Sequence, residues 1–137
     1  MAQILIVDDN QKIRRMLSRA LCDYRIETAV SGKEALLKIS SNQFHAVLLD
    51  VVLPDANDLE LLKEIKKLQP FCHVIVMTGY ASITLAVEAI KIGAYDFIEK
   101  PFTPSIIRNL IKKAIDESGI YDGSLPEKPA QEVRQVL

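Results

Sequence analysis

Short runs of apolar and β-branched residues alternate along this chain with amphipathic segments of helical period, and this alternation restricts the fold more than any other feature. Strands that are separated by helices pair in parallel, and the helices then cover both faces of the sheet. We therefore predict an α/β protein with a three-layer (βα)5, doubly wound parallel sheet. The expected strands are residues 4–7, 26–29, 46–49, 73–77 and 95–98.

Capping residues mark the starts of several expected helices. Ser31 and Glu34 have the spacing of a capping box. The first helix can begin at Asp9 or Asn10, because either side chain can accept hydrogen bonds from the free N–H groups of the first turn. The last helix is expected to begin at Thr103 or Ser105 and to bury Ile106, Ile107, Leu110, Ile111 and Ala114.

The length of 137 residues is enough for one domain with a substantial core and too short for two ordinary domains. Helical periodicity fades near residue 119, and the following segment is rich in Gly, Ser, Pro and charge. We expect residues 1–119 to form the domain. Residues 120–137 are expected to be a linker or tail towards an output domain outside this chain.

Charge and composition exclude several functions. The net charge is −1, so this segment carries no basic excess for direct contact with nucleic acid. The longest apolar runs have four or five residues, far fewer than the ~20 that a membrane helix needs, and no secretion signal stands at the start. A cytoplasmic location is the expectation, with Cys22 and Cys72 as reduced core residues rather than a disulfide or metal site.

Polar residues stand where the expected strands end. Asp8 and Asp9 follow the first strand, Asp50 the third, Thr78 the fourth and Lys100 the fifth. Ligands of open parallel sheets bind at the carboxyl ends of the strands. Clustered carboxylates favour Mg²⁺, and a carboxylate can attack phosphorus when the metal and a cation neutralise the transferring group. The strand ends therefore predict phosphoryl chemistry, with a lysine charge and a threonine hydroxyl available to the phosphoryl oxygens.

Four segments of the chain share a family pattern: ILIVDDN at 4–10, LLDVVLP at 48–54, MTGYA at 77–81 and GAYDFIEKPF at 93–102. Together they resemble the signature segments of response-regulator receiver domains of bacterial two-component systems. The resemblance covers residues 2 to about 118. It departs from the family pattern at Asp58, where the family usually has glycine.

The resemblance implies a mechanism and a topology. Asp50 would be the phosphoacceptor, Thr78 and Lys100 would sense the phosphoryl group, and Phe97 would be the aromatic switch residue. Mg²⁺ would be bound by Asp8, Asp9, Asp50 and the main-chain carbonyl of Val52. The implied fold is flavodoxin-like with strand order 2-1-3-4-5. The Lys100–Pro101 peptide bond would be cis.

The resemblance also implies partners and a mode of action. The domain would be a switch rather than an enzyme, would receive its phosphoryl group from a sensor histidine kinase, and would form a homodimer that phosphorylation strengthens. The region around residues 86–97 is most similar to receivers of transcription activators of the nitrogen-regulation and dicarboxylate-transport type, although receivers on helix-turn-helix outputs are nearly as similar. In the family, the residues two positions after the phosphoacceptor and two after the threonine flank the approach of the water that hydrolyses the aspartyl phosphate. Here they are Val52 and Tyr80, which carry no acid or amide group to orient that water, so we expect slow self-dephosphorylation.

Three alternatives remain. A Mg²⁺-dependent aspartyl-phosphate phosphohydrolase usually has a second carboxylate two residues after the nucleophile, where this chain has Val52. A nucleotide- or flavin-binding module needs a glycine-rich phosphate loop, whereas the five glycines here are scattered. A degenerate receiver that serves as an interaction surface is disfavoured because each chemical residue is present.

Overall fold

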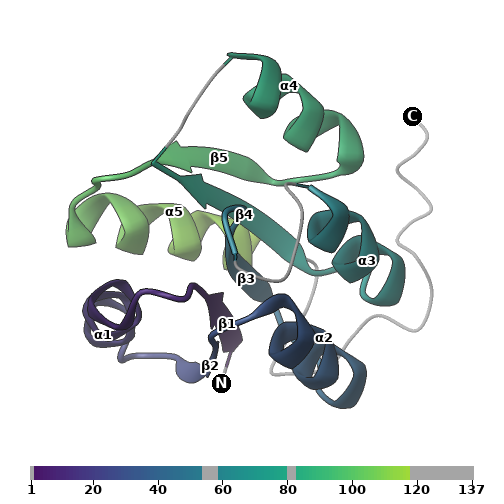
Figure 1. Ribbon diagram of the computed structural model, residues 1–137. Coiled ribbons are helices and arrows are strands. Elements are labelled where there is room, and N and C mark those ends of the chain that lie inside the picture. The colour runs from purple at the N-terminus through teal and green to yellow at the C-terminus, as the bar shows by residue number, and fades with distance from the viewer. Residues whose placement is uncertain (1, 54–58, 80–82, 118–137) are drawn as a thin grey trace.

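The structure, a computed structural model, describes residues 2–53, 59–79 and 83–117, and within them five parallel strands and five helices form three layers (Figure 1). The strand order is β2-β1-β3-β4-β5, which confirms the prediction. Asp58, Tyr80 and the expected tail lie outside the described residues. In chain order the elements are β1 (Gln3–Val7), α1 (Gln11–Ala20), β2 (Arg25–Ala29), α2 (Gly32–Ser41), β3 (Ala46–Asp50), α3 (Glu60–Leu68), β4 (His73–Thr78), α4 (Ile83–Ile92), β5 (Asp96–Glu99) and α5 (Pro104–Asp116).

The central strands are covered on both faces. Helices α1 and α5 lie on one side of the sheet, and α2, α3 and α4 lie on the other (Figure 1). Consecutive residues of a strand point to opposite faces, so Ile4 and Ile6 pack with α1 and α5 while Leu5 and Val7 pack with the opposite layer. All four are fully buried. This double burial explains why the sequence of β1 is a continuous apolar run, with each large side chain contributing ~1.5–3 kcal/mol of stability.

The helix starts confirm the capping predictions and decide between the alternatives. Asn10, not Asp9, caps α1, since its side-chain oxygen accepts from the N–H of Lys12 at 2.8 Å. Ser31 Oγ accepts from the N–H of Glu34 at 3.1 Å. Thr103, not Ser105, caps α5. Each cap satisfies donors that the first helical turn leaves free, and the cap at Asn10 ends the turn directly after Asp8 and Asp9.

Two expectations about burial are wrong. Ile106 is 52% exposed, because the buried stripe of α5 runs through Ile107, Ile111 and Ala114 and Ile106 lies to one side of it. Cys22 is exposed in the turn after α1, whereas Cys72 is buried, and both are free. Burial raises the pKa of the Cys72 thiol to about 12. Cys72 is therefore a neutral core residue, and Cys22 is a surface residue.

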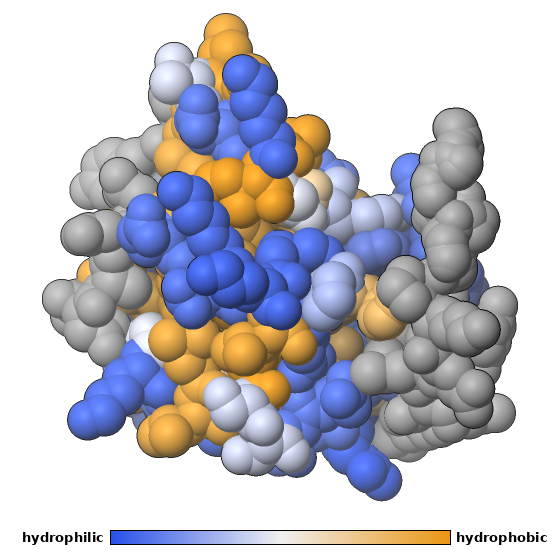
Figure 2. Space-filling view, turned by 90° about the vertical axis from the view of Figure 1, so that its right-hand side faces the viewer, coloured by the Kyte–Doolittle hydropathy of each residue, from blue (hydrophilic) through white to orange (hydrophobic). Residues whose placement is uncertain are grey.

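Helix α4 exposes much of its apolar surface. Ala89 is its buried residue, while Ile83, Val87 and Ile90 are 85%, 45% and 50% exposed. Figure 2 shows hydrophobic side chains at the top of the molecule, where α4 lies. Among the described residues, no helix has the length and apolar character that crossing a membrane requires.

Candidate functional site

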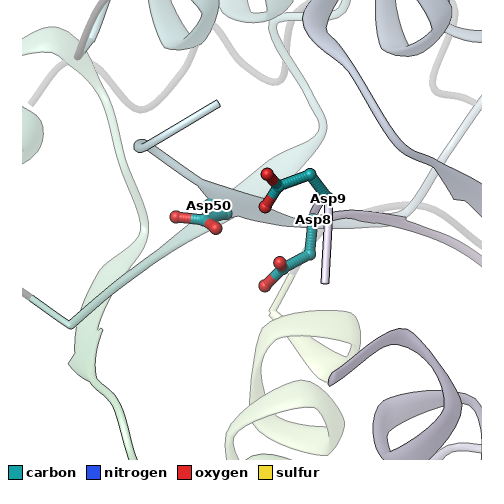
Figure 3. Close-up of side chains that lie close together, drawn as sticks. All are labelled: Asp8, Asp9 and Asp50. Carbon is teal, nitrogen blue, oxygen red and sulfur yellow. The ribbon is translucent and has the colours of Figure 1, made fainter. Parts of the chain in front are cut away.

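Three carboxylates gather where β1 and β3 end (Figure 3). The two strands are neighbours in the sheet, with Val7 in register with Leu49, so the residues that follow both lie at the same edge. Asp8, Asp9 and Asp50 each offer one carboxylate oxygen, and these oxygens all lie within 4.8 Å of one another. The acidic cluster that the strand ends predict is therefore present.

Asp8 is the most enclosed member of the cluster. It is fully buried, its Oδ1 accepts a hydrogen bond from the N–H of Asn10 at 2.9 Å, and its Oδ2 accepts one from Nζ of Lys100 at 2.7 Å. Asp9, the next residue, is exposed. The turn between β1 and α1 thus presents one fixed carboxylate and one accessible carboxylate to the same space.

Asp50 is the last residue of β3 and is 4% exposed. Its Oδ1 accepts from the N–H of Val52 at 3.0 Å, and its Oδ2 accepts from Nζ of Lys100 at 3.1 Å. Burial raises the pKa of the Asp50 carboxyl above its ordinary value, the Val52 hydrogen bond and the Lys100 charge oppose this, and the negative charge of Asp8 adds to it. A bound cation near this carboxylate would favour its ionised form.

Lys100 bridges Asp8 and Asp50 from the end of the fifth strand. Its main-chain N–H donates to the carbonyl of Thr78 at 2.8 Å, and the Lys100–Pro101 peptide bond is cis, as predicted. Burial alone would lower the pKa of the Lys100 ammonium, but hydrogen bonding to Asp8 and the charges of both carboxylates outweigh burial and raise this pKa. The lysine therefore stays charged beside the cluster.

Thr78 lies in β4, the strand next to that of Asp50, and Phe97 lies in β5, on the far side of β4. Thr78 is fully buried at the end of β4, whose preceding residue Met77 is in register with Asp50. Phe97, in β5, is partly buried and packs against the core layer formed with α2, α3 and α4. The structure thus places the predicted threonine at the strand ends and the predicted switch ring on the sheet face below them.

Arg14 contacts the site and was missed from the sequence. Its guanidinium donates to the main-chain carbonyl of Asp8 at 2.8 Å. In the sequence Arg14 stands beside Arg15 in the first helix, and cations on a helix are usually solvated. The helical periodicity of the sequence does not show which of the two arginines contacts the site.

The donor set fits a hard divalent cation. All three candidate ligands are carboxylates, which Mg²⁺ and Ca²⁺ prefer, and the ammonium group of Lys100 pairs with two of them, Asp8 and Asp50. Mg²⁺ retains several waters and binds through few protein carboxylates, so a cluster that is open at Asp9 suits it. The residues therefore fit the metal that the sequence predicts.

Comparison with known proteins identifies the family. The sequence model of the response regulator receiver domain family matches residues 4–112 of this chain. The chain belongs to this family. Among solved structures, a CheY-like receiver domain protein from Methanospirillum hungatei has a TM-score of 0.83 and 37% identity over 86% of this chain and 96% of that chain. The beryllofluoride-activated NtrC4 receiver domain dimer has a TM-score of 0.82 and 40% identity, over 86% of this chain and 99% of that one.

Sequence relatives of this receiver domain include transcriptional regulators of the type that the sequence indicates. The transcriptional regulatory protein ZraR of Escherichia coli O157:H7 is 35% identical over 135 residues, which are 97% of this chain and 31% of that protein. The chain thus spans about a third of the length of such relatives. The receiver resemblance drawn from the four signature segments is confirmed.

Proposed function

We propose that this receiver domain is a phosphorylation-dependent signalling switch in which Asp50 accepts a phosphoryl group in the presence of Mg²⁺. The observation that carries the proposal is the shared contact of Lys100 Nζ with Asp8 and Asp50, at 2.7 and 3.1 Å. Through this contact, the proposed nucleophile Asp50, the proposed metal ligand Asp8 and the positive charge of Lys100 lie together at the carboxyl edge of the sheet.

In the proposed reaction, a carboxylate oxygen of Asp50 attacks the phosphorus atom of the donor. A P–O bond to Asp50 forms, the bond from phosphorus to the donor breaks, and the donor leaves with the electron pair. The ammonium group of Lys100 is placed to balance charge on the phosphoryl oxygens, and the hydroxyl of Thr78 is proposed to donate a hydrogen bond to one of them.

Asp8, Asp9, Asp50 and the main-chain carbonyl of Val52 are proposed to hold the metal. Bound Mg²⁺ would neutralise charge on the transferring group. The N–H of Val52 already bonds Oδ1 of Asp50, which keeps the main chain of Val52 close to the carboxylate. Thr78 and Phe97 are proposed to carry the signal away from the site, from the end of β4 to β5.

The switch is proposed to act between two protein partners. A sensor histidine kinase would supply the phosphoryl group, and an output domain reached through residues 120–137 would read the state of the switch. ZraR and its counterparts are transcriptional regulators about three times as long as this chain, which supports a transcriptional output. A cytoplasmic location, no nucleic-acid contact from this segment and a non-enzymatic role belong to the same proposal.

Phosphorylation is proposed to strengthen homodimerisation through α4, β5 and α5. The exposed Val87 and Ile90 offer this face an apolar centre. Among the charged residues of this face, Lys112 already pairs with Asp116 within α5, at 3.5 Å. Glu88 and Lys91 are exposed on α4. The apolar residues are therefore the better candidates to carry the free energy of association.

The phosphohydrolase alternative is separated from the switch by turnover. The test incubates the protein with acetyl phosphate, with and without Mg²⁺, and measures intact mass and released phosphate. One phosphate per chain, present with Mg²⁺ and absent in Asp50→Asn, is expected. The control Asp23→Asn removes an exposed carboxylate outside the site and should label normally. Equal labelling of Asp50→Asn contradicts the proposal, and rapid release of many phosphates per chain favours the hydrolase.

A further inference from the structure

Every polar group of Asp8 has a partner, and one of these partners is a side chain with no role in the proposed reaction. The N–H of Asp8 donates to the carbonyl of Ala29 at 3.1 Å, and its two carboxylate oxygens accept from Asn10 and Lys100. The remaining group, the main-chain carbonyl, accepts from the guanidinium of Arg14 at 2.8 Å. Asp8 is fully buried, so these contacts fix its position.

The carbonyl of Asp8 lies beyond the sheet ladder. The register of β1 with β2 and with β3 ends at Val7, which pairs with Ala29 and Leu49. A buried carbonyl at this point needs a donor from outside the strands, because leaving it without one costs free energy. Arg14 supplies that donor from the second turn of α1.

The contact between Arg14 and Asp8 connects α1 to the acidic turn that precedes it. Arg14 is anchored in α1 by the bond from its main-chain N–H to the carbonyl of Asn10, at 3.1 Å, and its side chain reaches back six residues to Asp8. Asn10 in turn caps α1 and donates to Oδ1 of Asp8. The strand end, the acidic turn and the helix start are thereby tied together by one arginine.

Arg14 also brings a permanent positive charge to the main-chain side of Asp8. Lys100 occupies the carboxylate side of the same residue, so the buried acid lies between two cations. Outer contacts of this kind orient metal ligands, and their loss commonly weakens metal binding by about 10–100-fold.

We propose that Arg14 is a positioning residue of the metal site, which holds the β1–α1 turn so that Asp8 and Asp9 present their carboxylates to Mg²⁺ together with Asp50. The inference rests on the proposed function, since it takes these residues to be the metal ligands. Arg14 acts through Asp8 and does not touch the reacting atoms.

Three variants test this role. Arg14→Met removes the donor and the charge but keeps an unbranched side chain in the helix. Arg14→Lys keeps the charge and one possible donor. Arg15→Met is the matched control, because Arg15 is the adjacent, exposed arginine of α1 and its removal changes the net charge by the same amount.

Two measurements are made on each purified protein. Amide hydrogen exchange at Asp9 and Asn10, followed by NMR without metal, reports the order of the turn. Titration with Mg²⁺, followed by amide shifts, gives the metal affinity. We expect Arg14→Met to speed exchange in the turn and to weaken Mg²⁺ binding by about tenfold. Arg14→Lys should recover part of both losses, and Arg15→Met should match the parent.

Labelling kinetics separate positioning from general damage. In Arg14→Met the Mg²⁺ concentration for half-maximal labelling by acetyl phosphate should rise about tenfold, while the rate at saturating Mg²⁺ stays close to that of the parent. Equal effects of Arg14→Met and Arg15→Met, or none from either, would overturn the positioning role alone. A parent protein that binds no Mg²⁺ would overturn both this role and the proposed function.

Discussion

The ammonium nitrogen of Lys100 lies 3.1 Å from Oδ2 of Asp50, and the same atom lies 2.7 Å from Oδ2 of Asp8. One cation therefore holds together two carboxylates from neighbouring strands at a buried edge of the sheet. The charge of Lys100 offsets their mutual repulsion, and a bound metal ion would share that role. We therefore expect Lys100 to affect both the stability of the metal-free domain and its affinity for Mg²⁺.

Removing this cation should destabilise the metal-free protein. Lys100→Met leaves two enclosed carboxylates without the ammonium group. We expect the free energy of unfolding to fall by about 3 kcal/mol, the lower end for a broken buried pair, because the Lys100 side chain is 19% exposed. The variant should also bind Mg²⁺ more tightly than the parent and gain more stability from it. Denaturant unfolding with a chelator and then with Mg²⁺ measures both effects.

The matched control for this loss of charge is Lys112→Met. Lys112 forms an exposed pair with Asp116 in α5, and pairs of this kind contribute about 0–1 kcal/mol. A Lys100→Met variant as stable as Lys112→Met without metal would show that the bridge between Asp8 and Asp50 does not stabilise the fold.

Stability should fall in mild acid because His45 must remain neutral. It is 3% exposed, and its Nδ1 accepts a hydrogen bond from the N–H of Gln3 at 3.1 Å. Burial lowers its pKa below the ordinary value of 6.5. The unfolded chain therefore takes up a proton that the folded protein resists, and stability that is present above pH 6.5 is lost as the pH falls below it, by at most ~1.4 kcal/mol per pH unit.

His45→Asn tests this pH dependence. Its amide oxygen can replace Nδ1 as the acceptor for Gln3 but does not titrate in this range. His73, whose pKa is also lowered by burial, remains as a common background in both proteins. We expect a shallower loss of stability between about pH 7.5 and 5.5 in the variant. Parallel curves for the two proteins would exclude His45 as the source.

The phosphorylated state should be long-lived. Val52 is 51% exposed beside Asp50 and has no group that orients water, and the sequence places Tyr80 two residues after Thr78. We expect Val52→Asn combined with Tyr80→Glu to lose its phosphate at least about tenfold faster than the parent after the donor is removed. Val52→Ala, which also lacks a polar group, should decay at the parent rate. Decay of the parent within seconds would rule out this expectation.

Association should depend on the apolar face of α4. Replacing Ile90, which is 50% exposed, by Glu should weaken dimerisation of the beryllofluoride-treated protein by at least about tenfold, because it buries a charge in the proposed contact. Leu37→Glu, on the exposed face of α2, is the control. Sedimentation velocity gives the association constant of each variant. Association that is unchanged in Ile90→Glu, or identical with and without beryllofluoride, would place the dimer contact elsewhere or remove it.

The sequence predicts the acidic site well because the site residues lie at the end of an apolar run or within two residues after it. Parallel pairing brings those run ends to one edge, so Asp8, Asp50 and Lys100 meet although 50 and 92 residues separate the lysine from its partners. Arg14 could not be found in this way. Its partner is a main-chain carbonyl group. Every residue has one, so the sequence does not indicate this contact.

Errors in burial have a similar origin. A helical stripe predicted from the sequence is broad, and the neighbouring helix and the sheet decide which of its margins is covered. Ile106 lies about 100° around α5 from Ile107, so one side chain is exposed while the next is fully buried. The capping choice between Asp9 and Asn10 was open for a different reason, because both residue types can accept the bonds.

The most direct test of the account is to locate the phosphoryl group. Protein treated with acetyl phosphate and Mg²⁺ is reduced with borohydride, which converts an aspartyl phosphate to homoserine, and the peptides are sequenced by mass spectrometry. The account predicts homoserine at position 50 in the treated sample and aspartate there when Mg²⁺ is withheld. Homoserine at Asp8 or Asp9, or unmodified Asp50 in a protein that carries phosphate, would contradict it.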